Sequence, residues 1–328
     1  MLIILNEKEI QRFYQMKDAI EDIKDILKAK SEGKIAAPQR TVLDIPAEEA
    51  SALYMPSADL ANQMAAVKVV TIFPGNPASG MPTTQGIIVL SSTANGAHLA
   101  AMNASYLTRL RTGAMSAIAT ESLARQNAAK LAVIGTGAMA FEQCLGVMAV
   151  RDIEEITLYN RTQEKTKEFA SRLRNAGYTG SFTFHTDANK AVAEADIVCC
   201  ATKTTAPLFK GECLAKGAHV NGVGSYLPHM RELDEYTITN ASKIVVDDLH
   251  GTQHEAGELM HAEENGIWQF SEVHAELIHL VTGEKAGRES EEELTFFKSV
   301  GASYYDLAVA QGVYRKAIEQ GIGSMVEI

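Results

Sequence analysis

Residues 130–162 read KLAVIGTGAMAFEQCLGVMAVRDIEEITLYNRT, and this stretch predicts the fold. The apolar run Leu131–Ile134 enters the turn Gly135–Ala140, which has the form G-x-G-x-x-A. A helix-compatible segment follows, and a second apolar run ends at Tyr159. In such a βαβ unit the first glycine permits a tight turn, the second lets a pyrophosphate approach the backbone, and the small last residue lets helix pack on strand. The N-terminus of the helix adds free N–H groups and the positive end of its dipole. The sequence therefore predicts a dinucleotide-binding turn.

The residues after the second strand bear on which dinucleotide binds. An NAD-specific site usually places Asp or Glu there to bind the adenosine ribose. This chain has Asn160, Arg161 and Thr162 instead. A neutral amide leaves room for a 2′-phosphate, and an arginine and a hydroxyl can bind one. We therefore expect NADP(H), with NAD(H) as the alternative if Arg161 is only a solvated residue at the strand end.

Strand-like and helix-like segments alternate from Lys130 onward, which predicts a doubly wound parallel sheet of the Rossmann type in an α/β fold. Before this region, helical spacing of apolar residues predicts a helix around residues 19–27, and an Asn-Gly signal predicts a hairpin between Gly86–Leu90 and Ala97–Met102. Ser303–Ala317 is expected to form an amphipathic helix that packs on the first domain. The strands expected in the parallel sheet are Leu131–Ile134, Glu155–Tyr159, Ser181–His185, Ile197–Ala201, His219–Val223 and Lys243–Val246.

Composition limits the classes of protein to consider. The 328 residues suggest two domains, and 46% hydrophobic with 22% charged residues is ordinary for a globular protein. A net charge of −11 without a basic stripe argues against a nucleic-acid partner. No apolar run has the length of a membrane span, and Met1–Glu7 lacks the basic region of a signal peptide. The cysteines show no disulfide pattern, so we expect a reducing, cytoplasmic setting. They are Cys144, Cys199, Cys200 and Cys213, and the adjacent pair should face opposite sides of a strand.

Three basic residues in the first part of the chain are candidates for substrate binding and catalysis. Lys68 lies in the strand-like run Met64–Phe73. On a covered face it would be costly unless paired, and burial would lower its pKa toward that of a useful proton donor; on a solvated face it carries no such meaning. Arg40, and Arg111 at the start of an alanine-rich helix expected over Arg111–Ala124, suit bidentate capture of a carboxylate. A surface ion pair is the commoner role of an isolated arginine.

These residues belong to a wider set of motifs. The set is Arg40, Lys68, Leu110–Ala114 with Ser116–Ala117, Gly135–Ala138, Asn221–Gly224 leading to Pro228, Glu255–Glu258 and Val300–Gly301. On these motifs the chain resembles the ornithine cyclodeaminase/mu-crystallin family over nearly its whole length. The resemblance implies a Rossmann NAD(P)-binding domain, 121–302, inserted in an α+β substrate-binding and dimerisation domain, 1–120 plus 303–328, and it implies a homodimer.

The resemblance also implies that Arg40, Lys68 and Arg111 line the carboxylate and the imine of a small substrate. In our hypothesis the arginines bind the carboxylate, and Lys68 favours or supplies the proton of the imine nitrogen, since an iminium accepts hydride better than a neutral imine. Tyr226 or Ser225 is expected to orient the substrate. The cofactor-binding residues expected are Thr83, Thr84, Gly135, Thr136, Gly137, Ala138, Met139, Asn160, Arg161, Thr162, Ala201, Thr202, Val223, Gly224 and Gly301.

Members of the family differ in reaction. In cyclodeaminases an aspartate two residues before the proline of the loop after the fifth strand acts in proton transfer. Here Tyr226 holds that position before Pro228, and a phenol with a pKa of about 10 is a poor substitute for a carboxylate. We therefore expect an NAD(P)H-dependent reductase of cyclic α-imino acids, converting Δ1-pyrroline-2-carboxylate or Δ1-piperideine-2-carboxylate to L-proline or L-pipecolate.

Other functions stay open at this point. They are an ornithine cyclodeaminase (ornithine to proline plus ammonia), an amino-acid dehydrogenase, an opine-type imine reductase, and a nucleotide-binding crystallin-like protein without turnover. A metal enzyme is not expected, because the densest histidine cluster does not match a zinc-binding spacing. That cluster is His250, His254 and His261 with Glu255 and Glu258.

Overall fold

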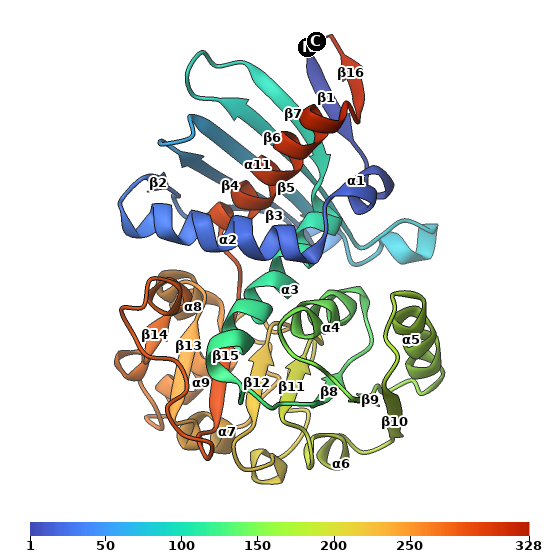
Figure 1. Cartoon of the computed structure of the whole chain (residues 1–328), viewed down its shortest axis with the longest axis vertical. Helices are drawn as coiled ribbons and strands as arrows, with labels where there is room; N and C mark the ends of the chain where they lie inside the picture. Colours follow the sequence, from blue (N-terminus) through green and yellow to red (C-terminus); the bar gives the residue numbers. More distant parts are fainter. Residues whose placement is uncertain (328) are drawn as a thin grey trace. The chain divides into compact units, whose positions relative to one another are not determined.

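The computed structural model describes residues 1–327, which form two compact units (Figure 1). Unit 1 contains residues 1–111 and 302–327, and unit 2 contains residues 112–301. The chain passes from unit 1 into unit 2 within the helix α3 (Ala104–Leu123) and returns after Gly301. Within residues 1–327 no helix is both long and apolar enough to span a bilayer.

Unit 1 is built on one eight-stranded sheet. Its elements are β1 (Leu2–Leu5), α1 (Glu7–Phe13), α2 (Met16–Ser31), β2 (Ile35–Ala36), β3 (Thr41–Ile45), η1 (Pro46–Glu48), β4 (Ala50–Asp59), β5 (Met64–Ile72), η2 (Asn76–Ser79), β6 (Thr84–Ser92), β7 (His98–Asn103), α11 (Ser303–Gln320) and β16 (Ser324–Val326). The strand order is β16-β1-β7-β6-β5-β4-β2, with β3 also paired to β4. Only the β1–β7 pair among these is parallel. Helix α11 packs across β4, β5 and β6, and α2 packs on α11 (red and blue in Figure 1).

The first helix and the hairpin expected in this part of the chain are confirmed. The hairpin pairs β6 with β7 in antiparallel register. Gly96 in its turn has a φ of 78°, a backbone conformation that costs energy for most residues other than Gly and Asn. The apolar stripe of α2 is buried, as its helical spacing requires. Its members are Ala19, Ile20, Ile23, Ile26 and Leu27.

Unit 2 is a second eight-stranded sheet, and every strand pair in it is parallel. After α3 its elements are β8 (Lys130–Ile134), α4 (Ala138–Val150), β9 (Glu155–Tyr159), α5 (Glu164–Asn175), β10 (Ser181–His185), α6 (Ala188–Val192), β11 (Ile197–Cys200), η3 (Gly211–Cys213), β12 (His219–Gly222), α7 (Glu235–Asn240), β13 (Lys243–Val246), α8 (Leu249–Glu255), α9 (Gly257–Glu264), η4 (Phe270–Glu272), β14 (Ala275–Glu276), α10 (Leu277–Val281) and β15 (Thr295–Lys298). The order β10-β9-β8-β11-β12-β15-β13-β14 reverses direction at β8, between β9 and β11. Ligands of open α/β sheets bind at the carboxyl ends of the strands at such a switch point. The Rossmann-type sheet and its expected strands are confirmed.

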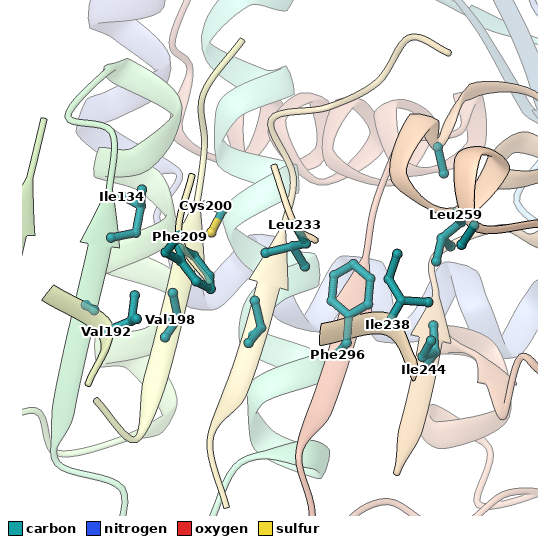
Figure 2. Packing of buried hydrophobic residues seen from close by; sticks show 14 of the residues in the cluster. Ile134, Val192, Val198, Cys200, Phe209, Leu233, Ile238, Ile244, Leu259 and Phe296 are labelled. Atoms are coloured by element: carbon teal, nitrogen blue, oxygen red, sulfur yellow. The ribbon is translucent and has the colours of Figure 1, made fainter. Parts of the chain in front are cut away.

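Both faces of the parallel sheet are covered by apolar clusters. Along β11, Val198 and Cys200 belong to one cluster, whereas Ile197 and Cys199 belong to the other. Figure 2 shows the first cluster, in which Phe296 of β15 and Phe209 pack beside the strands. The adjacent cysteines therefore face opposite sides, as strand periodicity predicts. Burial on both faces explains why these strands are continuous apolar runs.

Two features of the fold differ from the sequence-based expectation. In the parallel sheet, β14 and β15 were not predicted, because β14 has only two residues and β15 follows a charged segment and ends in Lys298. The alanine-rich helix α3 begins at Ala104, not at Arg111, because the Asn103 side chain accepts a hydrogen bond from the Tyr106 N–H (2.9 Å) and caps the helix there. Arg111 therefore lies within the helix and not at its start.

Candidate active site

In unit 1, two of the predicted catalytic residues meet around an acid that the sequence analysis did not identify. The ammonium Nζ of Lys68, on β5, lies 2.6 Å from Oδ2 of Asp306, in the first turn of α11. The Nε of Arg111, on α3, lies 3.3 Å from Oδ1 of the same carboxylate. The side chains of Lys68 and Asp306 are only 3% and 2% exposed. One carboxylate thus bridges two buried cations from different elements.

The sequence carried a signal for Asp306 that went unused. On the expected last helix, Asp306 is spaced three and seven residues from Val309 and Val313, so it lies on the buried stripe of the helix. An acid on such a stripe needs a buried cationic partner. Which cations it pairs with depends on strand and helix packing, which spacing does not reveal.

The residues opposite Lys68 on the two adjacent strands are apolar. Its neighbours across β5 are Met55 on β4 and Ile88 on β6, both buried. Burial lowers the pKa of Lys68 to about 8; the carboxylate of Asp306 opposes this shift, while the charges of Arg111 and Arg40 add to it. The covered-face interpretation of Lys68 is therefore confirmed, and its proton is easier to release than that of an ordinary lysine.

The remaining candidates in unit 1 lie near strand ends. Arg40 precedes β3 and is half-buried, and its charge acts on Lys68. Thr83 and Thr84 stand where β6 begins, and the carbonyl of Thr83 accepts a hydrogen bond from the Phe73 N–H (2.7 Å). The expected contacts of Thr83 and Thr84 with a cofactor stay predictions.

In unit 2, the glycine turn has the geometry that a pyrophosphate site needs. Gly135 has a φ of 93°, and a Cβ there would lie 2.6 Å from Cγ2 of Thr202. A Cβ on Gly137 would have no neighbour within 4 Å, so this side of the turn is open. Helix α4 begins at Ala138, followed by Met139, and presents its free N–H groups there. The Thr136 hydroxyl is buried and has no hydrogen-bond partner among the described residues. These features fit a dinucleotide phosphate.

A buried acid organises the neighbouring strand ends. Glu232 accepts hydrogen bonds from the N–H of Thr202 (2.6 Å), from its hydroxyl (2.8 Å) and from the N–H of Gly224 (2.7 Å). Burial raises the pKa of Glu232. Glu232 was missed in the sequence, where nothing distinguishes it from a surface glutamate. It holds together the ends of β11 and β12, where Ala201, Thr202, Val223 and Gly224 were predicted to bind the cofactor.

The loop after β12 is held by a second buried network. The ammonium of Lys298, at the end of β15, lies 2.9 Å from Oε1 of Glu258 and also donates to Ser225. The Ser225 hydroxyl donates to Glu258 (2.6 Å to Oε2), and none of these three side chains is solvent-exposed. A direct contact between Ser225 and a substrate would require this network to open, so that role stays a prediction. Tyr226, the next residue, is half-buried against the core of unit 2, and burial raises the pKa of its phenol.

The last predicted cofactor residue lies where the chain leaves unit 2. Asp247 accepts hydrogen bonds from the Ser299 hydroxyl (2.7 Å), the Val300 N–H (3.1 Å) and the Gly301 N–H (2.6 Å). Gly301 has a φ of 84°, which explains the glycine. Its contact with a cofactor is not tested by these bonds.

The end of β9 carries no carboxylate. The Asn160 side chain donates to the Thr162 carbonyl (2.8 Å), and Arg161 is exposed. The histidines considered for a metal make other contacts: His254 bonds the His250 carbonyl and packs edge-on against the His250 ring, with 4.9 Å between ring centroids, and His261 pairs with Glu235. No group of three or more His, Cys, Asp and Glu side chains in residues 1–327 is placed to hold a metal ion.

Known proteins match this chain over nearly its whole length. The model of the ornithine cyclodeaminase/mu-crystallin family matches residues 2–321. The chain belongs to this family. A relative from Bacillus cereus, Delta(1)-pyrroline-2-carboxylate reductase, is 40% identical over 326 residues, covering 99% of this chain and 100% of the relative.

Solved structures lead to the same group of enzymes. The Delta(1)-pyrroline-2-carboxylate reductase of Thermococcus litoralis, in complex with NADH and L-proline, superposes with a TM-score of 0.94 at 34% identity, covering 99% of this chain and 100% of that one. An archaeal alanine dehydrogenase dimer with bound NAD gives a TM-score of 0.92 at 33% identity, covering 100% of this chain and 99% of that one. The expected family, the fold and a nicotinamide-dependent enzyme are thereby confirmed.

Proposed function

We propose that this chain is an NAD(P)H-dependent Δ1-pyrroline-2-carboxylate reductase that forms L-proline, with the six-membered imino acid as a second substrate. The observation that carries the proposal is the buried Lys68–Asp306–Arg111 cluster, which sets a proton donor beside a carboxylate-binding arginine. The full-length similarity to reductases of this name supports the same reaction.

The charges of the cluster suit an anionic substrate. Lys68 and Arg111 together carry two positive charges against one negative charge on Asp306. A substrate carboxylate supplies the missing negative charge, and the planar guanidinium of arginine binds it in two-point geometry. Arg111 and Arg40 therefore bind and orient the substrate, which is a large source of rate enhancement.

Lys68 supplies the proton. With its lowered pKa it transfers a proton to the imine nitrogen, and the resulting iminium is the better hydride acceptor. When bound at the glycine turn, the reduced nicotinamide cofactor supplies the hydride for the imine carbon. Tyr226 lies on the loop fixed by Lys298 and Glu258, and the expected substrate contact of Tyr226 or Ser225 stays a prediction.

The experiment is to follow reduced-nicotinamide absorbance with purified protein and Δ1-pyrroline-2-carboxylate, beside a reaction of ornithine with NAD. Rapid cofactor oxidation with the imino acid and no proline from ornithine is the expected result. Formation of proline and ammonia from ornithine would contradict the reductase assignment, because it would mean that Tyr226 is compatible with cyclodeamination. Lys68→Ala and Arg111→Ala should each lose most activity, and near-wild-type turnover by either would refute its role.

We further propose a preference for NADPH. Asn160 leaves the end of β9 without a carboxylate, and the exposed Arg161 is free to approach a 2′-phosphate. The expected result is a higher kcat/KM with NADPH than with NADH, reduced selectively by Arg161→Ala. Lys167→Ala, which removes an exposed charge farther along α5, is the matched control. Equal use of both cofactors by the wild-type protein would refute this preference.

We also propose a homodimer formed through the sheet face of unit 1 opposite to α11. Tyr54, Val69 and Ile87 lie side by side in register on that face, and Tyr54 and Ile87 are 38% and 44% exposed. An apolar row of this kind marks an interaction surface. Light scattering should show a dimer for the wild type and a monomer for Val69→Asp, while Leu60→Asp, in an exposed turn, should stay dimeric. A monomeric wild type would refute this proposal.

A further inference from the structure

The cluster in unit 1 contains one anion whose part in the reaction differs from that of the cations around it. Asp306 lies in the first turn of α11, where the positive end of the helix dipole stabilises a carboxylate. Each of its oxygens contacts a different cation, Lys68 at 2.6 Å and Arg111 at 3.3 Å. Because both oxygens are engaged and buried, the carboxylate fixes where the two cations lie relative to each other.

We infer that Asp306 is a positioning residue of the reductase, which holds Lys68 and Arg111 in their reactive arrangement and keeps Lys68 charged in apolar surroundings until it protonates the imine. This inference rests on the proposed function and adds to it the residue that controls the proton donor. The side chains next to Lys68 on the adjacent strands, Met55 and Ile88, carry no charge. The charged groups that act on Lys68 are Asp306, which favours its ammonium form, and Arg111 and Arg40, which oppose it.

The proton balance shows why a carboxylate is needed at this place. Lys68 loses one N–H bond and becomes neutral, the imine nitrogen gains that proton, and the imine carbon then takes hydride from the reduced nicotinamide to give the amino acid and the oxidised cofactor. Lys68 recovers its proton from water. Throughout the first step the positive charge moves only from Lys68 to the neighbouring iminium, and Asp306 compensates it in both positions.

The first test is Asp306→Asn, which keeps the shape and removes the charge. Loss of the anion lowers the pKa of Lys68, so the basic limb of the kcat/KM–pH profile should move down by about 1–2 pH units. At a pH above the Lys68 pKa of both proteins, the activity of the variant should be about 10- to 100-fold below that of the wild type, and at a pH below both pKa values it should differ little. The KM for the imino acid should stay the same or decrease, since the cluster becomes more positive. Ionisation of the free substrate is common to both proteins and cancels in the comparison.

The matched control is Asp59→Asn. Asp59 is also buried in unit 1, and it bonds Asn62 and Gln311 of α11. This variant should lose stability without moving the pH profile, because Asp59 does not contact Lys68 or Arg111. A downward shift of the same size in Asp59→Asn would contradict the inference.

A readout independent of turnover is the pH titration of the Lys68 13Cε resonance in lysine-labelled protein, assigned by its loss in Lys68→Met. It should report a midpoint near 8 in the wild type and a lower one in Asp306→Asn. If Asp306→Asn does not fold, Arg111→Met gives a prediction of opposite sign: removal of a neighbouring cation should raise the midpoint. Unmoved midpoints in folded variants would overturn the inference, whereas a wild type inactive on the imino acid would overturn the proposed function itself.

Discussion

Removal of the Lys298 ammonium should destabilise unit 2 strongly. Lys298 and Glu258 form an ion pair of 2.9 Å in which neither side chain is exposed, and Lys298 also donates to Ser225. In Lys298→Met the carboxylate of Glu258 stays buried without its partner, beside a second buried acid, Glu232. Breaking a buried pair by deleting one partner costs about 3–5 kcal/mol. This loss is a large part of a typical unfolding free energy of about 5–15 kcal/mol.

The assay is denaturant unfolding followed by fluorescence of Trp268, the one tryptophan of the chain, which is buried in the core of unit 2. The double variant Lys298→Met with Glu258→Gln should recover much of the loss, since it leaves no buried charge in the pair. A loss of unfolding free energy below about 1 kcal/mol, the range of solvent-exposed pairs, would refute this reasoning. A double variant whose loss equals the sum of the losses in the two single variants would refute it as well.

Three further predictions concern separate parts of the molecule. Lys68→Met should lower kcat by about 10²–10⁴-fold, the usual contribution of a general acid. Cofactor binding, measured by fluorescence titration, should stay unchanged. Weaker cofactor binding with an unchanged kcat would contradict the role of Lys68 as proton donor. Gly146→Ala should cost about 1–3 kcal/mol in unfolding free energy by overpacking, because the added Cβ would lie 2.2 Å from the carbonyl oxygen of Gly113. Gly75→Ala should be neutral, because a Cβ there would have no neighbour within 4 Å. Burial lowers the pKa of His219 from 6.5 to about 3, so the unfolded state binds the proton first as the pH falls. The unfolding free energy of the wild type should therefore decrease by up to about 1.4 kcal/mol per pH unit below pH 6.5. His219→Gln should lack this contribution, and an equal acid slope in wild type and variant would contradict the prediction.

The nucleotide unit was largely predictable because its signals are local. A buried strand, a glycine turn and a helix start lie next to one another in the chain, so Gly135–Ala138 identified the turn without knowledge of anything distant. The positive φ of Gly135 and the open space at Gly137 are the conformations that these residue types indicate. Of the strands missed in this unit, β14 has only two residues, and β15 follows a charged segment and ends in Lys298.

By itself, the sequence determined the alternation of strands and helices, the glycine turn between β8 and α4, and the presence of cationic residues in the first part of the chain. Only the tertiary structure decided which charges meet. Lys68, Arg111 and Asp306 come from a strand, a helix and a second helix far along the chain, and Lys298 pairs with Glu258 across 40 residues. The physical reason is that the state of a charged side chain depends on what is buried against it. Helix and strand periods tell which face a residue occupies, whereas the packing of remote elements sets its partner, its desolvation and hence its proton affinity.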